Sequence, residues 1–158
     1  MISLEELANA PSSGDRIAAL AARGPRVTGH ADAVEAAIAA VRDGARRHYA
    51  AGAHDDLDLE LLQGDASYAE GLSRLAQTGD LVAIAELAEV ISLTAAAQAA
   101  GDEVLAEAAW EAGAAGIGWG PTPELVGARA RARSGDPAAA SALMAAARQI
   151  TGDVASGR

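Results

Sequence analysis

The chain has 158 residues, the size of one ordinary domain, and a formal net charge of -10. It contains no cysteine, which excludes a disulfide scaffold, a cysteine-ligated zinc site and a thiol nucleophile. All 12 basic residues are arginines, and this acidic, lysine-free composition argues against nucleic acid as a partner. No apolar stretch reaches the roughly 18 uncharged residues of a membrane helix, and the N-terminus does not resemble a secretory signal. We therefore expect a cytoplasmic protein without a transmembrane segment.

Seven helices are expected in chain order, because alanine, leucine and glutamate fill the segments between glycine-containing breaks. Most breaks read Gly-Asp, a pattern in which glycine ends one helix in a left-handed conformation and aspartate caps the next. The expected helices cover 15–23, 31–51, 56–78, 81–100, 102–115, 122–133 and 136–150. The pattern predicts an all-α helical bundle as a single domain over residues 1–150, followed by a flexible C-terminal tail over residues 151–158.

The segment 31–51 combines an apolar stripe with a basic end. Four apolar residues at helical spacing are expected to face the core: Val34, Ala37, Ile38 and Val41. Three arginines follow: Arg42, Arg46 and Arg47. Cations at this end complement the helix dipole, which is one explanation for them, and an anion-binding site is the other.

The segment 81–100 is apolar nearly all round, and Glu86 and Glu89 are its only charged residues. Six of its apolar residues form one stripe, Leu81, Ile84, Leu87, Ala88, Ile91 and Ala95, but Val82, Val90 and Leu93 lie off it. A helix of this kind lies at the centre of a bundle or is covered by a partner.

Three further expectations concern the second half of the chain. The glycine-rich segment 113–120 is expected to be a loop, with Trp119 packed on the core, because glycine disfavours a helix interior. Trp110 is likewise expected to be a core or interface residue. The arginines of the segment 122–133 are expected on a solvated face: Arg129, Arg131 and Arg133.

The densest group of potentially functional residues begins at His48 and ends at Glu60. Asp55, Asp56 and Asp58 are candidate ligands for Mg²⁺, because this hard cation prefers oxygen ligands. The same residues fit the first turn of a helix, where Asp55 or Asp56 caps the backbone and the carboxylates complement the dipole. The sequence thus predicts Mg²⁺ as a possible cofactor and indicates no catalytic residue.

Gly64 is expected inside a helix, because the apolar positions around it keep helical phase. These positions are Leu61, Leu62, Ala66, Ala69, Leu72 and Leu75. An interior glycine costs roughly 1 kcal/mol relative to alanine. Its presence indicates that another helix passes close to this point.

The stretch 61–72, which begins Leu61-Leu62-Gln63-Gly64-Asp65, resembles the L-x-G-D-x-L-x-A helix of trans-polyprenyl diphosphate synthases. The segment 87–91 is similar to the family's next helix, and His54-Asp55-Asp56 resembles the start of its first aspartate-rich motif. The resemblance implies an all-helical isoprenoid-synthase fold, in which two DDxxD motifs hold Mg²⁺ ions that bind an allylic diphosphate.

This chain departs from the family pattern, because position 59 is leucine, no second aspartate-rich motif follows, and no lysine is present to bind a diphosphate. The resemblance therefore implies a small, catalytically incomplete subunit of a polyprenyl synthetase in isoprenoid biosynthesis, similar to component I of heptaprenyl diphosphate synthase. The implied partner is a catalytic prenyl synthase subunit or another copy of the chain, forming an oligomer.

Two other functions remain open from the residues alone. His54-Asp55 is also the central pair of HD-type metal-dependent phosphohydrolases, for which His30 or His48 would be the first ligand and Asp80 or Asp102 the last. A non-enzymatic helical interaction protein fits the composition equally well.

Overall fold

A computed structural model describes residues 13–49 and 56–155, and no strand occurs within them. The elements are α2 (Ser13–Ala22), the short 3-10 helix η1 (Pro25–Val27), α3 (Ala31–Tyr49), α4 (Leu57–Gln77), α5 (Leu81–Ala99), α6 (Glu103–Trp119), α7 (Pro123–Arg133) and α8 (Ala139–Ala155). The predicted all-α helical bundle is confirmed.

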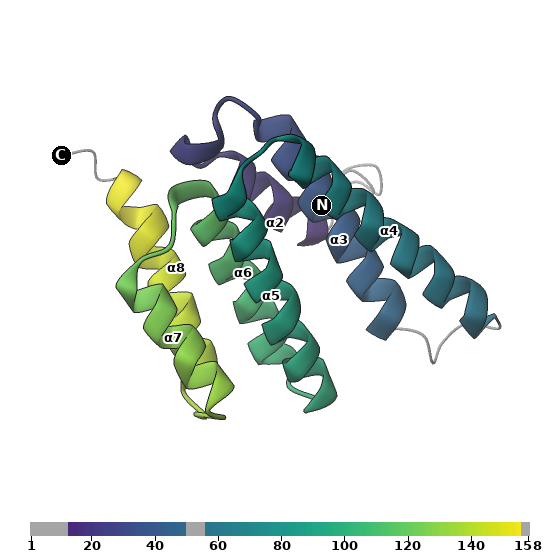
Figure 1. Cartoon of the computed structure of the whole chain (residues 1–158). Coiled ribbons are helices and arrows are strands. Elements are labelled where there is room, and N and C mark those ends of the chain that lie inside the picture. Colours follow the sequence, from purple (N-terminus) through teal and green to yellow (C-terminus); the bar gives the residue numbers. More distant parts are fainter. Residues whose placement is uncertain (1–12, 50–55, 156–158) are drawn as a thin grey trace, which may run out of the picture.

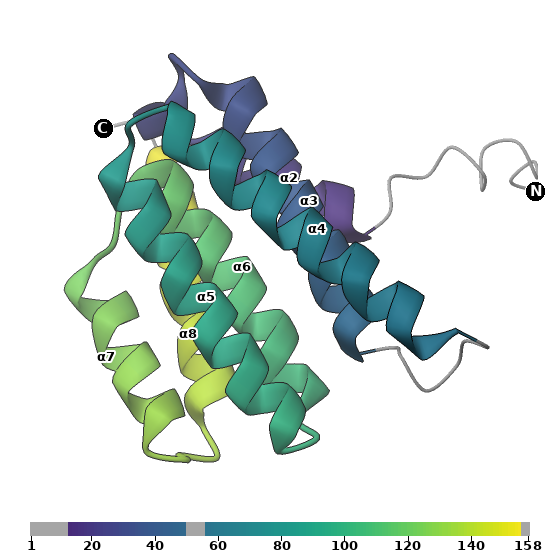
Figure 2. The same ribbon diagram turned by 45° about the vertical axis from the view of Figure 1, so that its right-hand side comes forward.

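Helix α6 is the centre of the bundle, because it packs against α2, α5 and α8 (Figure 1). Helix α3 pairs with α4 on one side and with α2 on the other. Figures 1 and 2 show that the α3–α4 pair and the α5–α6 pair diverge from the turn that joins α4 to α5. A pocket lined by residues of α3, α5 and α6 lies between the two pairs.

The predicted capping of helix N-termini by aspartate or threonine side chains is confirmed at four helices. The side chains of Asp56, Asp80, Asp102 and Thr122 each accept a hydrogen bond from the backbone amide three residues later, which satisfies an amide that the helix cannot. The glycines before three of the breaks have positive φ, as expected for helix ends: Gly79, Gly101 and Gly135.

Two clusters of buried residues form the core, one on each side of α6. The first joins α2, α3 and α5 to one face of α6 and includes Trp110, which is 5% exposed. The second joins α7 and α8 to the opposite face. Trp119 packs against both clusters, so the two tryptophans have the packing roles expected from the sequence.

The loop predicted over residues 113–120 is wrong, because α6 continues through the glycines to Trp119. A Cβ at Gly113 would lie 1.9 Å from Val90, and one at Gly118 would lie 2.6 Å from the Ala21 carbonyl oxygen. The glycines thus allow α5 and α2 to approach the backbone of α6. Close tertiary packing offsets the low helix propensity of glycine at these positions.

The boundaries at both ends also differ from expectation. Helix α2 begins at Ser13, so Gly14 lies inside the helix and does not mark a break. Helix α8 runs to Ala155, beyond the expected end at 150 and into the segment 151–158 predicted as a tail.

Helix α5 has one buried face, which includes only part of the stripe noted in the sequence: Leu87 is buried, and Ile84 and Ile91 pack against the core. Leu81 is 76% exposed, and Ala88 and Ala95 also face solvent. The buried apolar residues are Ala83, Leu87, Val90, Leu93 and Ala97. By length and composition, α5 is the one helix among the described residues that could cross a membrane, although core helices of soluble proteins pass the same test.

Candidate functional site

The structure describes two of the three candidate metal ligands, Asp56 and Asp58. Asp56 caps α4 by accepting the amide of Leu59 at 3.1 Å, and Asp58 lies exposed in the first turn of that helix. Asp55 lies outside the described residues. In the parts of the chain that the structure describes, no three histidine or acidic side chains gather closely enough to hold a metal ion. The capping explanation is thus confirmed for Asp56.

Two residues named for the phosphohydrolase alternative do meet. Nε2 of His30 lies 2.9 Å from Oδ2 of Asp80, and a terminal nitrogen of Arg26 lies 2.7 Å from Oδ1. Burial acts to raise the pKa of Asp80, but the amide of Ala83 and the side chains of Arg26 and His30 together hold that pKa below its usual value. This carboxylate already has partners at both oxygens, which fits a structural role at the start of α5. His54 lies outside the described residues.

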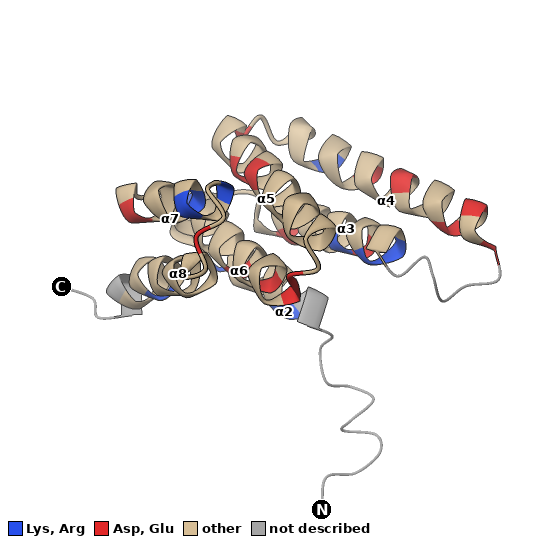
Figure 3. Ribbon diagram, turned by 90° about the horizontal axis from the view of Figure 1, so that it is seen from below, with Lys and Arg blue, Asp and Glu red and all other residues tan. Residues whose placement is uncertain are grey.

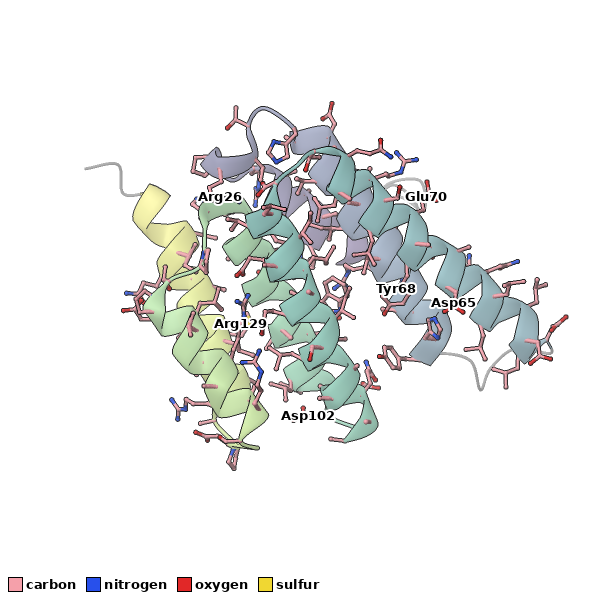
Figure 4. The ribbon with its side chains drawn as sticks, viewed as in Figure 1. Arg26, Asp65, Tyr68, Glu70, Asp102 and Arg129 are labelled. Carbon is pink, nitrogen blue, oxygen red and sulfur yellow. The ribbon has the colours of Figure 1, made fainter. Side chains whose placement is uncertain are left out.

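The second histidine contact joins α3 to α4. Nε2 of His48 lies 2.9 Å from Oδ1 of Asp65, and the His48 ring contacts Tyr68 at a centroid distance of 5.5 Å. Figure 4 shows Asp65 and Tyr68 on α4. Burial raises the pKa of Tyr68 to about 12. The contact between His48 and Asp65 thus joins the last turn of α3 to α4.

Gly64 has the role expected for it. It lies inside α4, and a Cβ there would be 3.0 Å from the His48 ring and 3.3 Å from the carbonyl oxygen of Gly44 on α3. The prediction that another helix passes close by is therefore confirmed.

A more informative site is the opening between α3 and the α5–α6 pair, which we call the Arg42 groove. Its volume is about 460 Å³. The lining residues come from three helices: Arg42, Ala45, Arg46 and Tyr49 of α3, Thr94 and Gln98 of α5, and Glu103, Ala106, Glu107 and Trp110 of α6.

Arg42 is the unusual residue in this groove. It is 4% exposed, and its guanidinium carbon lies 4.9 Å from the centre of the Trp110 ring, a cation–π geometry. Its Nε and one terminal nitrogen have no hydrogen-bond partner among the described residues. The other terminal nitrogen lies 3.5 Å from a carboxylate oxygen of Glu107, whose side chain is 60% exposed. Burial lowers the pKa of Arg42, and the carboxylate of Glu107 acts against that change.

Thr94 adds a second polar group without a partner. Its residue is 3% exposed, and the described part of the chain provides no hydrogen-bond partner for Oγ1. A buried polar group left without a partner costs about 1–3 kcal/mol, and more when it is charged. The groove thus contains donors that the described part of the chain does not satisfy.

The sequence contained a signal for Arg42 that the dipole explanation missed. Arg42 follows Ile38 by four residues and precedes Ala45 by three, so it is in phase with the buried stripe of α3. Arg46, by contrast, remains largely exposed, as the dipole explanation expects. The prediction of a solvated face is likewise wrong for Arg129, which is 4% exposed and paired with Glu86.

A larger groove of about 680 Å³ runs between α6 and α8. It includes Arg16, which is paired with Glu111 at 2.6 Å, and the apolar residues Val104, Ala108 and Met144. None of its lining side chains is among the buried polar groups without a partner. We therefore regard the Arg42 groove as the better candidate for a ligand site.

The outer side of α4 carries a second feature that the sequence analysis did not identify. Its exposed residues follow alternating steps of three and four, the spacing of a helix–helix seam, and none is charged. We call this set the α4 row: Leu59, Leu62, Ala66, Ala69, Ser73 and Ala76.

A matching set lies on the exposed side of α5. The α5 row is Leu81, Ala85, Ala88, Ser92, Ala95 and Ala99. In Figure 3, α5 lacks charged residues over most of its length, whereas acidic residues are spread along α4. Both rows are uncharged, and most of their residues are small, which permits close approach of another helix.

No family model matches the chain, and no curated protein or solved structure matches it either.

Proposed function

We propose that this chain is a non-enzymatic helical interaction protein that binds a helix of another protein along the α4 row. The observation that carries the proposal is the exposed seam itself. Leu62 is 66% exposed and Leu59 is 47% exposed, at positions where a coiled-coil helix would bury them against its partner. A surface helix of a self-sufficient protein more often places charged residues there.

The charges beside the α4 row indicate the chemistry of the partner. Asp58 and Asp65 lie along one edge of the row, and Glu70, paired with Arg74, lies along the other. If two copies paired through antiparallel α4 helices, the edge with Asp58 and Asp65 would face the same edge of the second copy. If the helices were parallel, Asp65 of one copy would approach Glu70 of the other. Both arrangements place like charges together. The surface therefore favours a different protein, with an amphipathic helix flanked by basic residues.

A polyprenyl diphosphate synthase is the specific partner that the sequence resemblance suggests, and it defines a second candidate function. Gly64, which belongs to the stretch similar to that family, lies at a close contact of α4 with His48 and Gly44 of α3. In this second candidate, the chain is an accessory, catalytically incomplete subunit whose α4 row packs against the catalytic one.

Co-purification with the intact chain tests the proposal. We expect the wild-type chain to capture a partner that the variant Ala69→Glu does not, because a carboxylate in the middle of the row would be buried at the interface. Val126→Glu is the matched control, since Val126 is 57% exposed on α7, away from the row. Binding should weaken as salt rises, and cross-linking should place α4 against a basic helix.

Three results would contradict the interaction with a different protein. The first is that the wild type and Ala69→Glu capture the same proteins, and the second is that salt does not affect binding. The third is a homodimer of the wild type in sedimentation that Ala69→Glu dissociates. Capture of a prenyl synthase by the wild type and by Val126→Glu, but not by Ala69→Glu, would select the second candidate.

A further inference from the structure

The Arg42 groove contains a recognition chemistry that the proposed interaction along α4 does not use. Two of its polar lining groups are buried, the guanidinium of Arg42 and the hydroxyl of Thr94, which come from two different helices. Nε and one terminal nitrogen of Arg42 have no hydrogen-bond partner among residues 13–49 and 56–155. A ligand that satisfies them must supply acceptor oxygens, and a carboxylate or phosphate does this best, because guanidinium groups pair with both.

We propose that the Arg42 groove binds a small organic anion, in which a carboxylate or phosphate group accepts hydrogen bonds from Arg42 and Thr94 and an apolar body lies against Trp110. The apolar part of the lining is made by Trp110 together with Ala45 and Ala106. The groove, at about 460 Å³, is within the range of sites that hold small molecules.

The carboxylate of Glu107 is the internal competitor of this ligand. It lies 3.5 Å from one terminal nitrogen of Arg42, longer than an ordinary N–H···O hydrogen bond, and its own side chain is 60% exposed. Binding replaces this loose contact with hydrogen bonds from the guanidinium of Arg42 to the ligand. Glu107 then moves into solvent.

The other charged groups of the groove determine how the ligand is oriented. Arg46 lies one turn beyond Arg42 on α3, is 57% exposed, and has a terminal nitrogen 3.6 Å from the carboxylate of Asp43. Glu103 lies on the α6 side and is exposed. The anionic end of the ligand therefore lies toward α3, away from the start of α6.

Titration calorimetry of the full chain with two probes tests the site. Inorganic phosphate and benzoate separate a phosphate ligand from a carboxylate with an apolar body, and benzyl alcohol is the neutral control. We expect saturable binding of at least one anion and none of the alcohol. Arg42→Met and Thr94→Val should each weaken binding by about tenfold or more, whereas Arg74→Met on the outer side of α4 should leave it unchanged.

A fourth variant gives a result in the opposite direction. Glu107→Gln removes the competing charge from an exposed position, so we expect the anion to bind several times more tightly than to the wild type. Circular dichroism establishes that each variant is folded, and Glu107→Gln tests the site even if Arg42→Met does not fold. The proposal is overturned if neither anion binds saturably at millimolar concentration, if Arg42→Met binds as well as the wild type, or if Glu107→Gln binds no more tightly.

Discussion

Both terminal nitrogens of Arg129 donate to the carboxylate of Glu86, at 3.1 and 2.5 Å, and both residues are buried. Figure 4 shows Arg129 on α7 beside α5, so the pair joins two helices that have few other contacts. A Cβ at Gly116 would lie 2.2 Å from an oxygen of Glu86, which places the carboxylate against the backbone of α6. This ion pair fastens α7 to the centre of the bundle.

Arg129→Ala should lower the free energy of unfolding by about 3–5 kcal/mol, because it leaves the carboxylate of Glu86 buried without a partner. Urea denaturation followed by circular dichroism measures the loss. The double variant Glu86→Leu with Arg129→Met should cost less than Arg129→Ala alone, since it leaves no buried charge. A double variant that is less stable than Arg129→Ala would contradict this explanation.

The neighbouring pair of Glu89 and Arg133 provides the matched control. It joins the same two helices, but its side chains are 38% and 49% exposed. Arg133→Ala should therefore change the free energy of unfolding by no more than about 1 kcal/mol.

The helix order of this fold could be predicted because most helix ends depend on local chemistry. Asp80, Asp102 and Thr122 cap their helices through amides three residues away, and such contacts are visible as short sequence patterns. The continuation of α6 through Gly113 and Gly118 was not predictable in this way. It depends on side chains and backbone of α5 and α2, which are distant in the sequence.

In the candidate site, too, local sequence patterns predict burial, but they do not predict which distant residues come into contact. The phase of Arg42 with Ile38 could have placed it on the buried face of α3, but its position over Trp110 depends on a residue 68 positions away. Glu86 and Arg129 are separated by 43 positions, so no pattern within either helix pairs them. Sequence periodicity indicates which face of a helix is buried, and the partner on that face comes from the tertiary fold.

Asp56 is expected to act as a helix cap, and its substitutions distinguish this role from metal binding. Asp56→Ala should lower the free energy of unfolding by about 1 kcal/mol, because the amide of Leu59 loses its acceptor. Asp56→Asn should restore most of that stability, since asparagine caps nearly as well as aspartate. Thermal denaturation with and without Mg²⁺ measures both effects. Stabilisation by Mg²⁺ that both substitutions abolish would instead identify Asp56 as a ligand.

Asp80 should make the protein sensitive to acid. Its hydrogen bonds hold its pKa below the value of about 3.9 expected in the unfolded chain. The folded state therefore gains stability from this carboxylate above that unfolded value, and the gain is lost as the pH falls through the lower folded pKa. Asp80→Asn keeps a capping residue but removes the charge that pairs with Arg26 and His30.

Urea denaturation from pH 7 down to acid conditions tests this sign. The wild type should be more stable than Asp80→Asn at pH 7, and the difference should shrink below about pH 4. The lowered pKa values of Asp43 and Asp136 affect both proteins alike, so they do not enter the difference. A difference that stays constant over this range would show that the charge of Asp80 contributes nothing to stability.

Gly71 should be intolerant of a side chain because it sets the distance between α3 and α4. A Cβ there would lie 2.6 Å from the carbonyl oxygen of Ala37 and 2.6 Å from Cγ2 of Val41. Gly71→Ala should therefore destabilise the protein by about 1–3 kcal/mol, even though alanine favours the helix by roughly 1 kcal/mol. Gly127→Ala on α7 is the control, because its Cβ would meet nothing within 4 Å, and it should stabilise the protein by up to about 1 kcal/mol. Urea denaturation measures both changes. If Gly71→Ala and the wild type were equally stable, α4 could move away from α3 at little cost. The close contact at Gly71 would then not set the distance between the two helices.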